Sequence, residues 1–236
     1  MKKLYLILTL LLVLFVFSFN TWAALIIITS PTDDVRIDKN EPTKNWNSDY
    51  HDSELLGVRY SDGGVYHSRS LLMFDLSAIP DAAIITGATL HIYSIPTSSA
   101  YVSLNRMADD NWAEGAVTWN SYQGSFSSAQ NMGGHTVVHT NSDPAWEEFS
   151  MVLNNWSWAD DLSDNQLTLM LGSVTNDGAY SVGTTFYSKE WDAHNSTNFR
   201  PYLTVEYSQV PVPAAVWLFA SGLIGLVGLR RKQTKD

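Results

Sequence analysis

The chain has 236 residues, of which 14 are basic and 24 are acidic, so its net charge is −10. An acidic surface of this kind argues against nucleic acid as a partner, because it repels the phosphate backbone. The chain has no cysteine, so no disulfide can stabilise it, and its stability must come from the core or from bound ions.

The first 23 residues have the pattern of a secretory signal peptide. Two lysines precede an apolar run from Leu4 to Phe19, and the small residues Ala23 and Ala24 follow. This order of charge, apolar run and small residues predicts export, with cleavage after Ala23 or Ala24. The alternative is an N-terminal membrane anchor that is never cut, which the large Trp22 beside the cleavage position favours.

The body of the chain, residues 24–208, is predicted to be one domain of short β-strands. Without the two ends, which hold six basic residues and one acidic residue, 8 basic and 23 acidic residues remain, a net charge of −15. Leu90 and Ile92 alternate with His91 and Tyr93, which is typical of a strand with one buried face. Further strand patterns occur at residues 25–28, 34–37, 55–60, 70–76, 101–106, 135–139, 167–171, 184–188 and 202–207.

Many short strands separated by turn residues predict an all-β fold, an antiparallel sandwich or barrel. One short helix is expected over residues 149–159, where Met151, Val152, Asn155 and Trp156 are close to helical spacing. We expect this helix to cap the sandwich.

Asp75 interrupts the apolar run of residues 70–76. A strand that is apolar on both faces is expected in the centre of a sandwich, and a buried carboxylate there needs a partner. We expect a structural ion pair between Asp75 and Arg69 or Arg200, with a functional carboxylate as the alternative.

Aromatic residues occur in two settings. Trp112 and Trp119 lie in a segment with strand-like alternation, which favours a place in the core. Four others lie in polar, turn-rich segments, where a flat ring can stack on the C–H face of a sugar. These candidate carbohydrate-binding residues are Trp46, Tyr50, Tyr66 and Trp191. The alternative is that they are packing lids over the core.

Acidic and amide side chains in predicted loops suit calcium, which binds several oxygen ligands. The candidates are Asp33, Asp34, Asp62, Asp109, Asp110, Asp192 and Asn195. No EF-hand spacing occurs among them, so the metal ligands are unknown and no cofactor is assigned beyond a structural calcium ion. The alternative is that they are solvated turn residues.

Catalytic motifs are not found in the chain. Its six histidines have no zinc spacing, and no nucleophile elbow, P-loop or dinucleotide fingerprint occurs. A glycosidase needs two opposed carboxylates, and a polysaccharide lyase needs a base near a charge-neutralising group. Nothing in the sequence pairs such groups, so we predict no catalytic residues.

Three stretches together resemble the DNRLRE domain, a carbohydrate-binding-module-like family of secreted bacterial and archaeal proteins. They are residues 68–93, 111–122 and 186–207, and the resemblance covers nearly all of residues 25–207. It implies a jelly-roll antiparallel β-sandwich that binds polysaccharide as an accessory, with alginate-type polymers among the known ligands. The hexapeptide that names the family is absent, so ligand identity is not carried over.

The last segment, residues 209–236, resembles the PEP-CTERM sorting signal. Pro211, Val212 and Pro213 match its proline-flanked tripeptide, with Val212 where the family has Glu. An apolar segment of residues 214–229 follows, which predicts a short transmembrane helix. A basic cluster then places the chain end in the cytoplasm; its members are Arg230, Arg231 and Lys232.

This resemblance implies processing by an exosortase that cuts near Pro211. The membrane would hold the chain through its C-terminal helix until that cut, and the body would then reach the cell surface or the extracellular matrix. The alternative is an ordinary single-span anchor that is retained.

The leading hypothesis is therefore an exported bacterial surface or matrix protein that binds extracellular polysaccharide without cleaving it. An alginate-like polymer is one expected partner. The first alternative is a structural or adhesive surface protein without glycan binding. The second is a polysaccharide-degrading enzyme.

Overall fold

The computed structural model describes residues 23–28, 30–48, 53–60, 67–95, 99–138, 144–153, 157–172, 182–191 and 199–208. Residues 25–81 and 85–207 form one compact unit, and the other described residues, 23–24, 82–84 and 208, belong to a second unit. The predicted sorting signal and all of the predicted signal peptide except Ala23 lie outside the described residues. Ala23 and Ala24 open the first strand.

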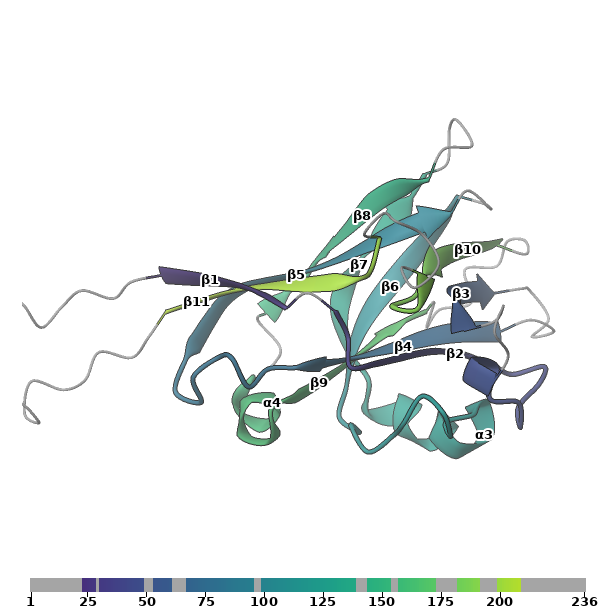
Figure 1. Ribbon diagram of the computed structural model, residues 1–236, viewed down its shortest axis with the longest axis horizontal. Coiled ribbons are helices and arrows are strands. Elements are labelled where there is room, and N and C mark those ends of the chain that lie inside the picture. Colours follow the sequence, from purple (N-terminus) through teal and green to yellow (C-terminus); the bar gives the residue numbers. More distant parts are fainter. Residues whose placement is uncertain are drawn as a thin grey trace, which may run out of the picture. The chain divides into compact units, whose positions relative to one another are not determined.

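The described residues form eleven strands (Figure 1). They are β1 (Ala23–Ile28), β2 (Asp33–Asp38), β3 (Leu55–Tyr60), β4 (His67–Asp75), β5 (Ile84–Ile95), β6 (Ala100–Met107), β7 (Gln130–Val137), β8 (Ala145–Ser150), β9 (Gln166–Leu171), β10 (Val182–Tyr187) and β11 (Tyr202–Ser208). The helical elements are the 3-10 turns η2 (Trp46–Ser48) and η4 (Gln123–Ser128) and the short helices α3 (Trp119–Tyr122) and α4 (Ala159–Asp164).

The strands pair in the order β1-β11-β5-β10-β3-β4-β9-β6-β7, while β2 pairs with β4 and β8 pairs with β5. The long strands β4 and β5 therefore have more than two partners, because they change neighbours along their length. The registers of β2 with β4, β4 with β9 and β5 with β8 are all antiparallel. This arrangement is consistent with the predicted all-β sandwich, and its jelly-roll connectivity stays a prediction.

The core is formed by the inward residues of alternating strands. Leu90 and Ile92 on β5 are fully buried, as are Leu203 and Val205 on β11. The residues between them, including His91, are half-buried and face outward. The alternation that the sequence predicts for these two strands is therefore confirmed.

The prediction of a helix over residues 149–159 is wrong where it can be checked, and residues 154–156 lie outside the described residues. Phe149 lies on β8, where it pairs with Leu90 and is buried. The helix α4 begins only at Ala159. Trp119 also differs from its prediction, because it opens helix α3 after the N-cap residue Thr118 instead of lying on a strand. Its predicted burial in the core is confirmed.

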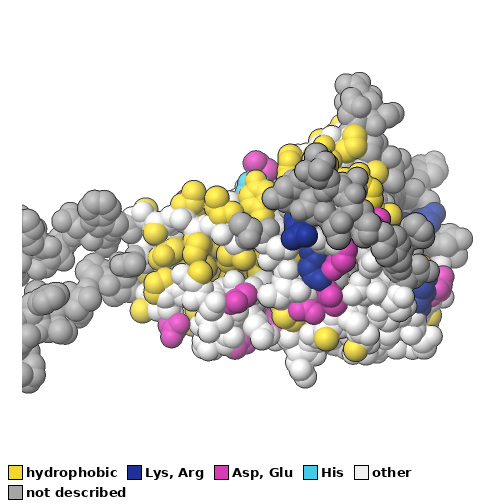
Figure 2. Space-filling model, in the orientation of Figure 1, with side chains coloured by type: hydrophobic (Ala, Val, Ile, Leu, Met, Phe, Trp, Pro, Cys, Tyr) yellow, Lys and Arg dark blue, Asp and Glu magenta, His cyan; other side chains and the backbone are white. Residues whose placement is uncertain are grey.

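Strand β1 presents apolar side chains to solvent, since Leu25 is 63% exposed and Ile27 is 54% exposed. Figure 2 shows hydrophobic side chains gathered over the region that β1 and β11 occupy in Figure 1. Among the residues that the structure describes, no helix has the length and apolar character needed to span a membrane.

Candidate functional site

A series of seven rings in mutual contact lies on the outward face of the strands β5, β8, β10 and β11 and the turns beside them. Trp146 is the most open of them and is 41% exposed, and the others are half-buried. We call this set the aromatic strip. Its members are His91, Tyr93, Trp146, Tyr187, Trp191, Phe199 and Tyr202.

At one end of the aromatic strip the rings are nearly parallel. Trp191 stacks on Tyr187 with centroids 3.9 Å apart and planes 8° from parallel. Tyr187 in turn lies 5.7 Å from Tyr93, and Tyr93 stacks on Phe199 at 4.2 Å. Within each stack the two facing ring surfaces cover each other, so a sugar can contact only the outer faces and edges. The C–H face of a sugar packs well against an aromatic face.

At the other end, an edge-on ring links two stacks. Trp146 makes T-shaped contacts of 5.3 Å with Tyr93 and with Tyr202. Tyr202 stacks on His91 with centroids 4.3 Å apart and planes 4° from parallel. The aromatic strip is therefore continuous from Trp191 to His91.

Strand alternation and register place these rings together. Because Leu90 and Ile92 point into the core, His91 and Tyr93 must point outward. In the antiparallel pairing of β5 with β8, Tyr93 lies opposite Trp146 and His91 lies opposite Glu148, and directly opposite residues share a face of the sheet.

Polar groups surround His91. Its Nε2 lies 3.1 Å from Thr204 Oγ1, and its Nδ1 lies 3.6 Å from Glu148 Oε1. Burial lowers the pKa of His91 and the Glu148 carboxylate opposes that change, so the imidazole is neutral at pH 7. A neutral imidazole can donate one hydrogen bond and accept another, as sugar hydroxyls require.

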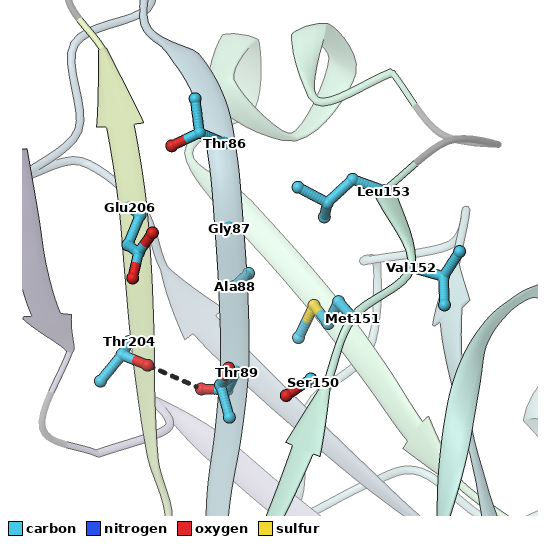
Figure 3. Close-up of a pocket in the computed structure, with 10 residues that line it drawn as sticks. All are labelled: Thr86, Gly87, Ala88, Thr89, Ser150, Met151, Val152, Leu153, Thr204 and Glu206. Atoms are coloured by element: carbon cyan, nitrogen blue, oxygen red, sulfur yellow. Dashed lines mark hydrogen bonds between the residues drawn. The ribbon is translucent and has the colours of Figure 1, made fainter. Parts of the chain in front are cut away.

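A cavity of about 400 Å³ continues the same face toward the start of β5. Figure 3 shows Thr204 and Glu206 on β11 beside Gly87 and Thr89 on β5. Ser150 lies on the other side of β5, at the end of β8. A Cβ atom at Gly87 would lie 3.1 Å from Glu206 Oε2, so the glycine leaves room for that carboxylate. The volume suits a small ligand or one or two sugar units.

The structure separates the four aromatic residues that the sequence singled out. Trp191 lies in the aromatic strip, while Tyr50 and Tyr66 lie outside the described residues. Trp46 is only 9% exposed, and the Arg36 guanidinium and the Lys44 ammonium lie 3.5 Å and 3.6 Å from its ring centroid. Trp46 is therefore placed in the core and not on a binding surface.

Asp75 is not a buried carboxylate. It is exposed at the end of β4, and its Oδ1 accepts a hydrogen bond of 2.8 Å from the Ser77 N–H. Arg69 lies six residues away on the same strand, where its guanidinium covers the Phe126 ring at 3.9 Å. In the described part of the chain no ion pair joins Asp75 to Arg69 or Arg200, so the predicted pair is not formed.

Among the described residues, a buried ion pair joins Arg106 on β6 to Asp161 on α4. Both nitrogens Nε and Nη2 of Arg106 donate to Asp161 Oδ1, at 3.1 Å and 2.8 Å. Burial raises the pKa of Asp161 to about 6 although Arg106 lowers it. This pair fastens helix α4 to the sheet, and no local pattern in the sequence marks it.

The candidate calcium ligands are dispersed. Asp33, Asp109 and Asp110 line a cavity of about 570 Å³, where Asp109 Oδ1 accepts a hydrogen bond from the Asn111 N–H. Asp34 instead lies close to Glu114 and Glu190, two residues that the sequence did not single out. The other candidates, Asp62, Asp192 and Asn195, lie outside the described residues.

Comparison with known families assigns the β-domain to a class of module. The model of carbohydrate-binding module family 96 matches residues 27–207. The chain belongs to carbohydrate-binding module family 96. This family assignment supports carbohydrate binding as the role of the β-domain and confirms the expected class of module. No curated protein matches the chain.

A second model, the PEP-CTERM protein-sorting motif, matches residues 209–232 of this family 96 chain. The match confirms the predicted sorting signal. It indicates export and a membrane-anchored stage that precedes processing by an exosortase.

Sequence reasoning missed most of the aromatic strip. Only Trp191 was singled out, while the outward positions of β5 and β11 hold His91, Tyr93 and Tyr202. Aromatic residues at consecutive outward positions of one predicted strand were the signal that could have found them.

Proposed function

We propose that the aromatic strip binds an extracellular polysaccharide without cleaving it. The observation that carries this proposal is the continuous series of half-exposed rings on a domain of a carbohydrate-binding family. Stacked rings on a rigid sheet lose little conformational freedom on binding, so most of the contact energy is available for affinity. Hydroxyl and carboxylate groups of Thr204, Glu148 and Glu206 flank the rings and can take hydrogen bonds from sugar hydroxyls.

The charge around the aromatic strip favours a neutral polymer over a polyanion. The Glu148 side chain is 69% exposed, Glu206 is exposed as well, and residues 24–208 carry a net charge of −15. An alginate-like chain, with one carboxylate per sugar, would be repelled unless cations screened it. We therefore propose a neutral polysaccharide as the preferred ligand and treat an alginate-like polymer as the competing one.

The groups beside His91 also favour binding over catalysis. A lyase acting on an acidic sugar needs a group that neutralises the sugar carboxylate. The neighbours of His91 are the Glu148 carboxylate and the Thr204 hydroxyl, and neither group carries positive charge. We infer that His91 orients sugar hydroxyls and does not abstract a proton.

The sorting motif supports a location outside the membrane. We propose that an exosortase cuts near Pro211 and that the acidic β-domain is then delivered to the cell surface or the polysaccharide matrix of a biofilm. In this account the C-terminal helix is a transient membrane anchor.

The experiment is affinity electrophoresis of the purified full-length chain in native gels that contain a neutral or an acidic polysaccharide. We expect retardation by a neutral polymer, and Tyr187→Ala should abolish it. The matched control is Tyr101→Ala, because Tyr101 is 51% exposed on β6 and is not part of the aromatic strip. Equal migration in every gel would support a structural or adhesive protein, and unsaturated or reducing sugar products would support an enzyme.

A further inference from the structure

Three carboxylates from distant parts of the chain meet at one point beside the sheet. Asp34 lies on β2, Glu114 lies in the turn after β6, and Glu190 lies in the turn after β10. One carboxylate oxygen from each residue lies within 4.8 Å of the others. We call this group the carboxylate cluster.

Backbone hydrogen bonds hold the carboxylate cluster together. The Asp34 N–H donates to Glu114 Oε2 at 3.2 Å, across 80 residues of chain. The Lys189 N–H donates to Asp34 Oδ2 at 2.8 Å, across 155 residues. The site is thus a preformed junction of three segments and not a chance gathering of surface acids.

Charge in the carboxylate cluster is only partly balanced. The Lys189 ammonium contacts Glu114 Oε2 at 2.6 Å and also contacts Glu190. One ammonium can neutralise one of the three carboxylates, so two negative charges remain. Asp34 is buried, while the Glu114 and Glu190 side chains are 25% and 26% exposed. Such an excess is costly unless a cation or a proton compensates it.

Two oxygens of the carboxylate cluster have no partner. Asp34 is 1% exposed, and its Oδ1 is buried without any hydrogen bond, as is Glu190 Oε2. Unpaired buried carboxylate oxygens are rare in native proteins, and a bound ion is one of their standard causes. These oxygens are free to act as ligands while Lys189 keeps its contacts with the other oxygens.

We propose that Asp34, Glu114 and Glu190 bind a calcium ion, with Asp34 Oδ1 and Glu190 Oε2 as direct ligands. The donors are all oxygens, which suits a hard cation, and no histidine or sulfur is among them, which disfavours zinc. Two residual negative charges match a divalent ion. Waters would complete the six to eight ligands that calcium takes.

The site has a consequence for the aromatic strip, and this step rests on the proposed function. Glu190 is followed directly by Trp191, whose N–H donates to Ser188 O at 3.4 Å and whose ring stacks on Tyr187. A cation that holds the Glu190 carboxylate would also hold this turn. Calcium would then order the Trp191 end of the aromatic strip.

The first test is calcium binding by the full-length chain after removal of metals with EDTA. Isothermal titration with CaCl₂ should show one site in the wild type, and binding should weaken at least tenfold in Glu190→Gln and in Glu114→Gln. Asp75→Asn is the matched control, because it removes an exposed carboxylate that lies outside both the carboxylate cluster and the aromatic strip. Terbium luminescence excited through tryptophan should appear in the wild type and fall in Trp191→Leu.

The opposing explanation is a proton held between Asp34 and Glu190, since burial and the nearby Glu190 carboxylate raise the pKa of Asp34. In that case calcium would neither bind nor raise the melting temperature of the wild type, and the proposal would be overturned. Equal calcium affinity in wild type, Glu190→Gln and Glu114→Gln would overturn it as well.

The glycan assay separates this inference from the proposed function. If calcium binds but EDTA leaves glycan affinity unchanged, the coupling to Trp191 is wrong while the proposed function stands. If glycans never bind in either state while Glu190→Gln still loses calcium, the proposed function is wrong and the metal site stands.

Discussion

Trp191 lies flat against Tyr187, with ring centroids 3.9 Å apart and planes 8° from parallel. Trp191 belongs to a turn and Tyr187 to the end of strand β10, so the stack continues the aromatic surface of the sheet past its last strand residue. Trp191 also directly follows Glu190, a member of the carboxylate cluster. The Trp191 turn therefore connects the candidate glycan surface to that cluster.

Replacement of Tyr187 by alanine should weaken polysaccharide binding at least tenfold, which corresponds to about 1.4 kcal/mol. The substitution removes the ring that bridges Trp191 and Tyr93, and aromatic anchors dominate the binding energy at such surfaces. Isothermal titration with an oligosaccharide measures the effect. An affinity equal to that of Tyr101→Ala would remove Tyr187 from the binding surface.

Trp46→Ala should lower the stability of the protein and leave its glycan affinity unchanged, because Trp46 is buried. Loss of its ring should lower the free energy of unfolding by about 3–5 kcal/mol, as is usual for large aromatic residues in cores. The molecules that remain folded should bind glycan with wild-type affinity. Urea unfolding and glycan titration below the unfolding transition measure the two effects, and wild-type stability with lost affinity would contradict the core placement.

Gly87→Val should block the cavity between β5 and β11. A Cβ atom added at Gly87 would lie 3.1 Å from Glu206 Oε2. The branched side chain of valine must therefore displace that carboxylate and fill the space beside Thr204. We expect affinity to fall about fivefold if the sugar chain extends from the rings into the cavity. Gly115→Val is the control, since a Cβ atom there meets no atom within 4 Å. Equal affinity of the two variants would restrict the ligand to the rings.

The Arg106–Asp161 pair should make stability depend on pH. Burial raises the pKa of Asp161 from its ordinary value of 3.8 to about 6 in the folded chain. A pKa that is higher in the folded than in the unfolded chain means that the native state binds the proton more tightly. The contribution of Asp161 to the free energy of unfolding therefore falls as pH rises from about 4 to about 6. Asp161→Asn should reduce the dependence of the unfolding free energy on pH, as measured by urea unfolding across this range. An unchanged slope would assign the pH dependence to other groups.

The sorting signal leads to a separate prediction for the mature protein. If an exosortase cuts near Pro211, mass spectrometry of protein recovered from the cell surface or medium should find the C-terminus near that residue. Peptides containing Arg230 should occur only in the membrane fraction of cells that lack the exosortase. Mature surface protein that keeps Arg230 would instead indicate a permanent anchor.

Sequence patterns predicted the strands well because alternation is local. Apolar residues occupy every second position of β5, at Leu90 and Ile92, and of β11, at Leu203 and Val205. A shift of the strand register by one residue would turn these side chains to the solvent. Strand β8 was not predicted, because its inward position Glu147 is charged and breaks the apolar alternation. That carboxylate is buried between His135 Nε2, at 2.8 Å, and the Ser94 hydroxyl, at 2.9 Å, partners that lie far from it in the sequence.

The binding surface was harder to predict because it is assembled across strands. Trp191 and Trp46 both have polar neighbours in the sequence, yet only Trp191 finds a stacked partner at the surface. Trp46 is buried because Lys44 and Arg36 turn back over its ring. Neither the pairing of Tyr93 with Trp146 nor the burial of Asp34 follows from spacing, because both depend on strand register and long-range contacts.

The most direct test of the central claim is hydroxyl-radical footprinting of the full-length chain with and without a polysaccharide that retards it in native gels. We expect ligand to protect Trp146, Tyr187 and Trp191 from oxidation, while Tyr101 reacts equally in both samples. Protection that falls on Tyr101 and spares all three rings would contradict the assignment of the aromatic strip as the glycan-binding surface.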